Sequence, residues 1–155
     1  MNSLQQKDKK YIWHTYTHQK SMEPAIPIVR GENTVLIDEN GKKYIDAVSS
    51  WWVNIHGHGN KFIAKKIYEQ AKKLQQVIFT AFTHEPAVVL AEKLLEVLPG
   101  NFSKIFYTDD GSTATEVAIK LAIQYWKNAG NSSRKKILAF HNSYHGDTFG
   151  AMSVS

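Results

Sequence analysis

The sequence of 155 residues contains no cysteine, which excludes disulfide bonds, thiol chemistry and zinc sites built from thiolates. No apolar run reaches the length of a membrane-spanning helix. The first residues also lack the apolar core of a secretory signal. These absences fit a reducing compartment, so we expect a cytoplasmic protein with no membrane partner.

Several catalytic and binding motifs are missing as well. The sequence has neither the phosphate loop that ends in Gly-Lys-Ser/Thr nor the Gly-x-Gly-x-x-Gly fingerprint of dinucleotide-binding folds. The Gly-x-Ser-x-Gly elbow of hydrolases and the His-Glu-x-x-His pair of metalloproteases are also absent. His56 and His58 could share a metal ion, but no carboxylate lies close in sequence, so we expect no metal site.

The composition is that of a globular protein, with 43% hydrophobic and 21% charged residues. The net charge of +5 raises the question of nucleic-acid binding. The lysines are scattered in pairs, however, and no nucleic-acid-binding motif accompanies them. A solvated surface explains the charge, and we expect no nucleic-acid partner. The pairs are Lys9-Lys10, Lys42-Lys43, Lys65-Lys66, Lys72-Lys73 and Lys135-Lys136.

The most informative stretch is Asp-Asp-Gly-Ser-Thr-Ala-Thr-Glu at residues 109–116. Residues 104–108 before it favour a β-strand, and the apolar spacing after it predicts a helix over 117–126. The start of that helix would direct free amides and a positive dipole at the turn, which suits a phosphate. Gly111 allows close approach of the backbone, and Ser112 supplies a hydroxyl. On this local pattern alone, a capped turn without a ligand remains an alternative.

Thr113 and Glu116 have the spacing of a capping box at this helix start. Residues 136–140 are typical of a second strand, so strand, helix and strand predict a parallel, right-handed βαβ unit. Ligands of such sheets lie beyond the carboxyl ends of the strands, where the loops 109–116 and 141–148 begin. Tyr144 in the second loop could lie flat on a planar cofactor or be a packed surface tyrosine.

The first part of the chain has a different character. Residues 1–30 read as an irregular, extended arm rich in aromatics that either bury in a neighbouring subunit or wall a pocket. Residues 28–48 predict two or three short antiparallel strands, with Asn-Gly at the centre of a hairpin turn. Residues 49–60 predict a loop with two adjacent tryptophans. Either these wall a pocket, or one lies in the core and the other packs against the arm. Further helices are expected over 61–76 and 85–98.

The turn Asp-Gly-Ser-Thr-Ala-Thr-Glu-Val-Ala-Ile-Lys and the later Tyr-His-Gly-Asp-Thr together resemble the fold-type I, class III aminotransferases, which use pyridoxal phosphate. The resemblance implies an α/β fold. Residues 1–58 would be the N-terminal arm and a small β element, part of the small domain. Residues 59–155 would be the first part of the large parallel-sheet domain that binds pyridoxal phosphate.

Four further segments narrow this resemblance to one branch of the family. That branch transfers the amino group of S-adenosylmethionine to 8-amino-7-oxononanoate in biotin synthesis. Two alternatives remain: a class III enzyme with another donor or acceptor, and a non-catalytic fragment that binds a phosphate ligand or partner subunit. The segments are His-Thr-Tyr-Thr at 14–17, Ser-Ser-Trp-Trp at 49–52, Ile-His-Gly at 55–57 and the run at 144–154.

Carried over residue by residue, the resemblance implies a role for five side chains or backbone positions. Gly111 and Ser112 would hold the cofactor phosphate. Tyr144 would stack on the cofactor ring and border the substrate. Trp51 would wall the substrate pocket, and Tyr16 would come from the arm as a catalytic residue that recognises the amino-oxononanoate and assists proton movement.

The resemblance also implies a homodimer with its active site at the subunit interface. Thr15 stands where the family usually has proline, a departure that would loosen the arm. The family's cofactor-binding lysine, its aspartate for the pyridine nitrogen and its late arginine for the substrate carboxylate match no residue here. We therefore expect this chain to be the front part of a longer protein, or a shortened form of one, and to be inactive alone.

Overall fold

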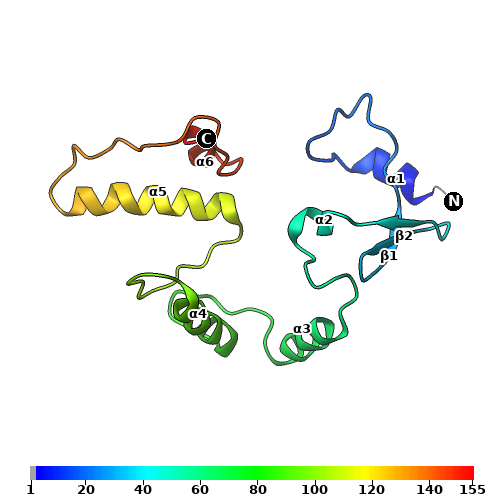
Figure 1. Cartoon of the computed structure of the whole chain (residues 1–155), viewed down its shortest axis with the longest axis horizontal. Coiled ribbons are helices and arrows are strands. Elements are labelled where there is room, and N and C mark those ends of the chain that lie inside the picture. Colours follow the sequence, from blue (N-terminus) through cyan, green and yellow to red (C-terminus); the bar gives the residue numbers. More distant parts are fainter. Residues whose placement is uncertain (1–2) are drawn as a thin grey trace. The chain divides into compact units, whose positions relative to one another are not determined.

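A three-stranded antiparallel sheet lies in the N-terminal half of the computed structural model, which describes residues 3–155 (Figure 1). Its strands are β1 (Ile28–Glu32), β2 (Val35–Asp38) and β3 (Lys43–Ile45), in the order β1-β2-β3. Each strand pairs with its neighbour in sequence. The predicted short antiparallel strands are thereby confirmed.

The turn between β2 and β3 is the predicted hairpin, with Gly41 at a φ of 82°. The buried carboxylate of Asp38 accepts hydrogen bonds from the amides of Asn40 and Lys42, each at 2.9 Å, and from the hydroxyl of Tyr44 at 2.9 Å. Burial alone would raise the pKa of Asp38, but these hydrogen bonds outweigh it and hold the pKa below its usual value. They also fix the turn.

The prediction of an irregular arm is wrong for its first residues, because helix α1 occupies Leu4–Tyr11. Ser3 and Gln6 form a capping box in which each side chain accepts the other residue's amide, at 3.2 Å and 3.0 Å. Pro24 and Pro27 lie beyond this helix and cannot prevent it. Residues 1 and 2, the start of the predicted arm, lie outside the described residues.

Helix α3 (Lys61–Lys73) confirms the helix predicted over 61–76, although it ends earlier. Asn60 caps it by accepting hydrogen bonds from the amides of Phe62 and Ile63, at 3.0 Å and 3.1 Å. The chain divides after Ile78 into a first unit, Met1–Ile78, and a second unit, Phe79–Ser155. The domain boundary expected after residue 58 stays a prediction.

The second unit contains the helices α4 (Glu85–Val97), α5 (Gly111–Asn128) and α6 (Phe149–Ser153). α4 confirms the helix predicted over 85–98. α5 begins six residues earlier than the 117–126 predicted from apolar spacing, because the polar turn itself is helical. Polar residues at the first turn of a helix carry no apolar period, so the spacing could not reveal them.

The predicted strands at 104–108 and 136–140 are not formed in the described chain, and neither is the βαβ unit (Figure 1). A strand is defined by hydrogen bonds to a neighbour, and within the described residues these two segments pair with none. Their apolar side chains are correspondingly open, with Leu138 97% and Phe140 83% exposed.

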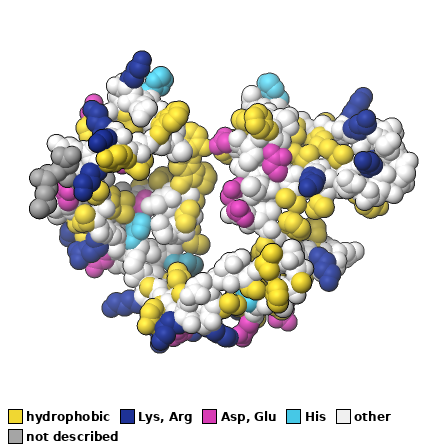
Figure 2. All heavy atoms as spheres, turned by 180° about the vertical axis from the view of Figure 1, so that it is seen from behind, with side chains coloured by type: hydrophobic (Ala, Val, Ile, Leu, Met, Phe, Trp, Pro, Cys, Tyr) yellow, Lys and Arg dark blue, Asp and Glu magenta, His cyan; other side chains and the backbone are white. Residues whose placement is uncertain are grey.

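Few hydrophobic side chains are buried in the described part of the chain, where only Ile37 and Ala151 fall in that class. Figure 2 shows many hydrophobic side chains at the surface, among polar and charged ones. Within residues 3–155, no helix has the length and apolar character needed to cross a membrane.

Candidate functional site

The amino end of α5 presents two free backbone donors. The carboxylate of Asp110 accepts the amide of Thr113 at 2.8 Å, and the hydroxyl of Thr113 accepts the amide of Asp110 at 3.1 Å. The capping box is therefore Asp110 with Thr113, and the predicted pairing of Thr113 with Glu116 is wrong. Within the described residues the amides of Gly111 and Ser112 have no acceptor, so they remain available to an anion.

The loop 141–148 is held against this helix start. The hydroxyl oxygen of Ser112 accepts the amide of Asp147 at 3.1 Å, and the hydroxyl of Thr115 donates to the carbonyl of His145 at 3.2 Å. The two loops that the sequence places after separate strands thus lie together, although side-chain hydrogen bonds and not paired strands connect them.

Glu116 joins the same contact from the next turn of α5. Its carboxylate accepts the amide of Gly150 at 2.6 Å, at the start of α6. This hydrogen bond from the Gly150 backbone and another from the side-chain hydroxyl of Thr148 lower the pKa of Glu116 below its usual value. The carboxylate therefore stays ionised and holds α6, where Ala151 is fully buried.

Two glycines shape the space around Ser112. Gly146 has a φ of 120°, and a Cβ built there would overlap the side chain of Ser112. Only glycine permits this close approach. A Cβ built at Gly111 would meet nothing within 4 Å, so the space beside that amide is open.

Tyr144 lies in the same neighbourhood and is 70% exposed. Its hydroxyl donates to the carboxylate of Asp147 at 3.0 Å. Asp147 therefore contacts Tyr144 through its side chain and Ser112 through its amide. The structure brings the three predicted cofactor residues, Gly111, Ser112 and Tyr144, into one region of the second unit.

The other two predicted residues meet in the first unit. The rings of Tyr16 and Trp51 stack with their centroids 5.5 Å apart and an angle of 28° between their planes. The two side chains are 73% and 66% exposed, so the pair offers a broad aromatic surface.

Trp51 belongs to α2 (Ser49–Trp52), which is a left-handed turn. Ser50 and Trp51 have φ values of 49° and 67°, and the residues on either side are also positive. For a non-glycine residue this conformation costs about 1–2 kcal/mol. The loop predicted over 49–60 did not include this turn, because neither serine nor tryptophan is a residue type that favours positive φ.

The carboxylate of Asp46 holds that turn. It accepts the amide of Ser50 at 2.8 Å and its hydroxyl at 2.7 Å, and Nε2 of His58 lies 2.7 Å away. These contacts, led by the Ser50 hydroxyl, lower the pKa of Asp46 to about 2. Sequence reasoning missed Asp46 and considered His58 only as a metal ligand, because no sequence spacing links these residues to Ser50.

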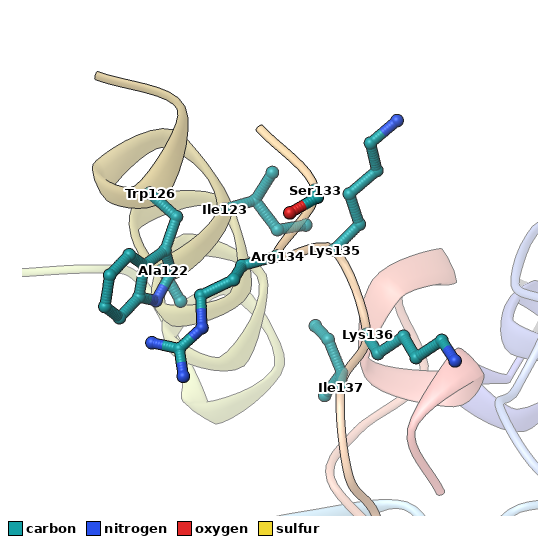
Figure 3. A pocket seen from close by; sticks show the side chains of 8 residues that line it. All are labelled: Ala122, Ile123, Trp126, Ser133, Arg134, Lys135, Lys136 and Ile137. Carbon is teal, nitrogen blue, oxygen red and sulfur yellow. The ribbon is translucent and has the colours of Figure 1, made fainter. Parts of the chain in front are cut away.

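A separate hollow of about 500 Å³ in the second unit lies toward the other end of α5 (Figure 3). The guanidinium group of Arg134 lies 4.0 Å from the ring centre of Trp126, and the side chains of Lys135 and Lys136 extend away from it. The positive charges do not converge on one point, and none of the predicted site residues lines this hollow.

Comparison with known proteins identifies the family. Residues 16–155 match the family described as "Aminotransferase class-III". The chain belongs to the class III aminotransferases. This family uses pyridoxal phosphate, as the resemblance of the two loops implied.

Two curated relatives show how much of a class III aminotransferase the chain covers. The adenosylmethionine-8-amino-7-oxononanoate aminotransferase of Staphylococcus aureus is 44% identical over 97% of this chain and 34% of the relative. The enzyme of the same name from Methanocaldococcus jannaschii is 44% identical over 99% of this chain and 34% of the relative. The chain therefore spans about one third of the length of the curated relatives it matches.

Solved structures of class III aminotransferases have the same backbone. The crystal structure of the Methanocaldococcus jannaschii enzyme matches with a TM-score of 0.93, at 44% identity over 97% of this chain and 35% of that chain. An omega transaminase of Pseudomonas jessenii in complex with PMP also has a TM-score of 0.93, at 32% identity over 99% of this chain and 35% of that chain. The chain thus has the fold-type I architecture expected of it, as the N-terminal part of that fold.

Proposed function

We propose that this protein transfers the amino group of S-adenosylmethionine to 8-amino-7-oxononanoate and so forms 7,8-diaminononanoate, with pyridoxal phosphate as cofactor. The observation that carries the proposal is the 44% identity, over nearly the whole chain, to relatives named for that reaction. The stacked Tyr16 and Trp51 support it, because they are the residues that the resemblance assigns to the acceptor.

The amino end of α5 fits the phosphate group of the cofactor. The amides of Gly111 and Ser112 are free, and the space beside Gly111 is open. The hydroxyl oxygen of Ser112 accepts the amide of Asp147, so its own O–H remains available to donate to a phosphate oxygen. Three donors and the positive end of the helix dipole suit a dianion.

Tyr144 fits a flat cofactor ring. Its exposed face is broad and its hydroxyl is held by Asp147, which leaves the ring little freedom to rotate away. We infer that Tyr144 covers the pyridine ring and excludes water from one side of it. When bound, pyridoxal phosphate supplies the electron sink that amino transfer requires.

The aromatic pair of the first unit fits the acceptor. The acceptor is a long aliphatic chain with few polar groups, and such a chain binds best to apolar, aromatic surfaces. We assign this contact to the Trp51 ring. The hydroxyl oxygen of Tyr16 would recognise the polar end near the ketone and hold or pass a proton there.

A second candidate function is amino transfer by a different donor and acceptor. The omega transaminase of Pseudomonas jessenii favours it, because its backbone matches this chain as well as the Methanocaldococcus jannaschii enzyme does. We give preference to the first function because the sequence identity to its namesakes is higher. We also propose that the protein is a cytoplasmic homodimer, as the resemblance implies.

The test uses the protein purified from its source and supplied with pyridoxal phosphate and 8-amino-7-oxononanoate. S-adenosylmethionine and a panel of other amines are offered separately, and 7,8-diaminononanoate is measured by mass spectrometry. We expect S-adenosylmethionine to be the one amine of the panel that yields product. Product formation with another amine and none with S-adenosylmethionine would establish the second candidate.

A further inference from the structure

We propose that Asp46 is a positioning residue for the substrate site: its carboxylate holds α2 in the left-handed form that places the Trp51 ring against Tyr16. The effect on catalysis rests on the proposed function. The effect on the geometry of the turn does not, because it can be measured without substrate.

Backbone hydrogen bonds close α2 but do not set its handedness. The amides of Trp52 and Val53 bond the carbonyls of Val48 and Ser49 at 2.7 Å and 3.0 Å, which closes the turn. Such bonds can close a right-handed turn equally well, and for L-residues the right-handed form is the favoured one. An interaction from outside the turn must therefore select the left-handed form.

Asp46 supplies that interaction. Its two carboxylate oxygens bind both the amide and the hydroxyl of Ser50, at 2.8 Å and 2.7 Å. Because backbone and side chain of the same residue are both bound, the φ and χ1 angles of Ser50 are fixed together. Ser50 directly precedes Trp51, so its conformation sets the direction in which the Trp51 side chain leaves the backbone.

Asp46 is in turn held by the sheet. Nε2 of His58 lies 2.7 Å from the carboxylate, and the side chains of Asp46 and His58 are only 6% and 16% exposed. The backbone of His58 exchanges two hydrogen bonds with Asn33, at 2.7 Å and 3.0 Å. The ring of His58 lies over Gly31, where a Cβ would come within 2.6 Å of it. The hairpin of β1 and β2 therefore fixes the carboxylate.

Asp46 makes no hydrogen bond to Trp51, yet it determines where the Trp51 ring lies. If the turn relaxed to the right-handed form, the Trp51 side chain would leave on another face and the stack with Tyr16, now at 5.5 Å, would be lost. Recognition of the apolar acceptor therefore depends on the carboxylate of Asp46, which does not contact the acceptor and only orients the Trp51 ring. Such support of a binding residue by a neighbour is a general requirement for precise sites.

The kinetic test compares Asp46→Ala with Asp38→Ala in the complete, cofactor-loaded protein. Both residues carry carboxylates that accept several hydrogen bonds, Asp38 at the end of β2 and Asp46 directly after β3, but only Asp46 contacts α2. We expect Asp46→Ala to lower kcat/KM for 8-amino-7-oxononanoate about tenfold, chiefly through KM, which is typical of the loss of one well-placed contact. Asp38→Ala is expected to leave it unchanged.

A double-mutant cycle shows whether Asp46 acts through Trp51. Added to Trp51→Ala, Asp46→Ala should lower kcat/KM further by less than about twofold, because the contact it supports is already gone. A second full tenfold loss would overturn the proposal. If Asp46→Ala fails to fold, Ser50→Ala takes its place, since it removes one of the two contacts and leaves the pair of Asp46 and His58 intact.

The geometry of the turn is measured by near-ultraviolet circular dichroism. The difference between wild type and Tyr16→Leu defines the signal of the stacked pair. We expect Asp46→Ala to lose this signal and Asp38→Ala to keep it. Retention of the full signal in Asp46→Ala would overturn the proposal. Loss of the signal in a protein that transfers no amino group from S-adenosylmethionine would overturn the proposed function alone.

Discussion

The rings of Tyr16 and Trp51 stack at 5.5 Å although the two residues are far apart in the sequence. Both have positive φ values, of 55° and 67°, and neither is a glycine. Strained backbone of this kind persists only where surrounding contacts enforce it, and it is concentrated at functional sites. The stack is therefore a specific arrangement and supports the assignment of Trp51 to the acceptor.

Replacing Trp51 with alanine should weaken binding of the acceptor. The loss of an aromatic contact surface of this kind is worth about 1.5 kcal/mol, or roughly a tenfold rise in KM, with kcat little changed. Steady-state kinetics with 8-amino-7-oxononanoate measures it. Trp52→Ala is the matched control, because Trp52 lies in the same turn, is also well exposed and stacks on no other ring among the described residues. A lower melting temperature with unchanged KM would show that Trp51 serves packing instead.

Replacing Ser112 with alanine should weaken binding of pyridoxal phosphate. The substitution removes a hydroxyl donor to a charged group, which is worth about 1.5–3 kcal/mol, or about 10- to 150-fold in affinity. Cofactor titration followed by absorbance measures it. Ser133→Ala is the control, since the Ser133 hydroxyl bonds only Asn131 on a surface loop. Equal cofactor affinity in wild type and Ser112→Ala would remove Ser112 from the phosphate site.

The helices of this protein could be predicted where an apolar stripe is sufficient to define them. α3 and α4 have such stripes, and their bounds were predicted to within a few residues. α1 has no such stripe and depends on the capping box of Ser3 and Gln6, a signal present in the sequence but overlooked. The strands at 104–108 and 136–140 require a hydrogen-bonding neighbour, which a local pattern cannot supply.

In the candidate site, the cofactor residues could be predicted from the sequence, but the residues that support Trp51 could not. Gly111, Ser112 and Tyr144 follow from short motifs, and the structure places them together. Asp46 and His58 could not be found from the sequence, because their role depends on a left-handed turn that serine and tryptophan do not signal. Residues that act by fixing the backbone of another residue have no motif of their own.

Replacing Tyr144 with alanine should weaken cofactor binding and lower turnover. Aromatic stacking contributes about 0.5–1.5 kcal/mol, so we expect a loss of up to roughly tenfold in cofactor affinity. Tyr144→Phe separates the ring from the hydroxyl, which bonds Asp147 at 3.0 Å. We expect a smaller loss of cofactor affinity than in Tyr144→Ala, because the ring remains although Asp147 no longer holds it. If Tyr144→Ala binds and turns over like wild type, Tyr144 is only a surface tyrosine.

Asp46 should stabilise the folded protein in a defined pH range. Its pKa is lowered from 3.8 to about 2 by Ser50 and His58, so the folded state favours the ionised carboxylate. Its contribution is therefore fully present above pH 4 and is lost as the pH falls toward 2. The melting temperatures of wild type and Asp46→Asn should differ above pH 4 and converge below it. A difference that is constant from pH 6 to pH 2 would contradict this assignment.

Replacing Gly146 with alanine should disrupt the contact between the loop 141–148 and α5. The substitution places a methyl group against Ser112 at a φ of 120°, and positive φ alone costs a non-glycine residue about 1–3 kcal/mol. Gly130→Ala is the matched control, because Gly130 has a φ of 80° but nothing within 4 Å of its Cβ position. Both variants should lose thermal stability through backbone strain. Only Gly146→Ala should also lose cofactor affinity, because it alone displaces the Ser112 hydroxyl; equal losses of affinity in the two would mean that the loop does not position Ser112.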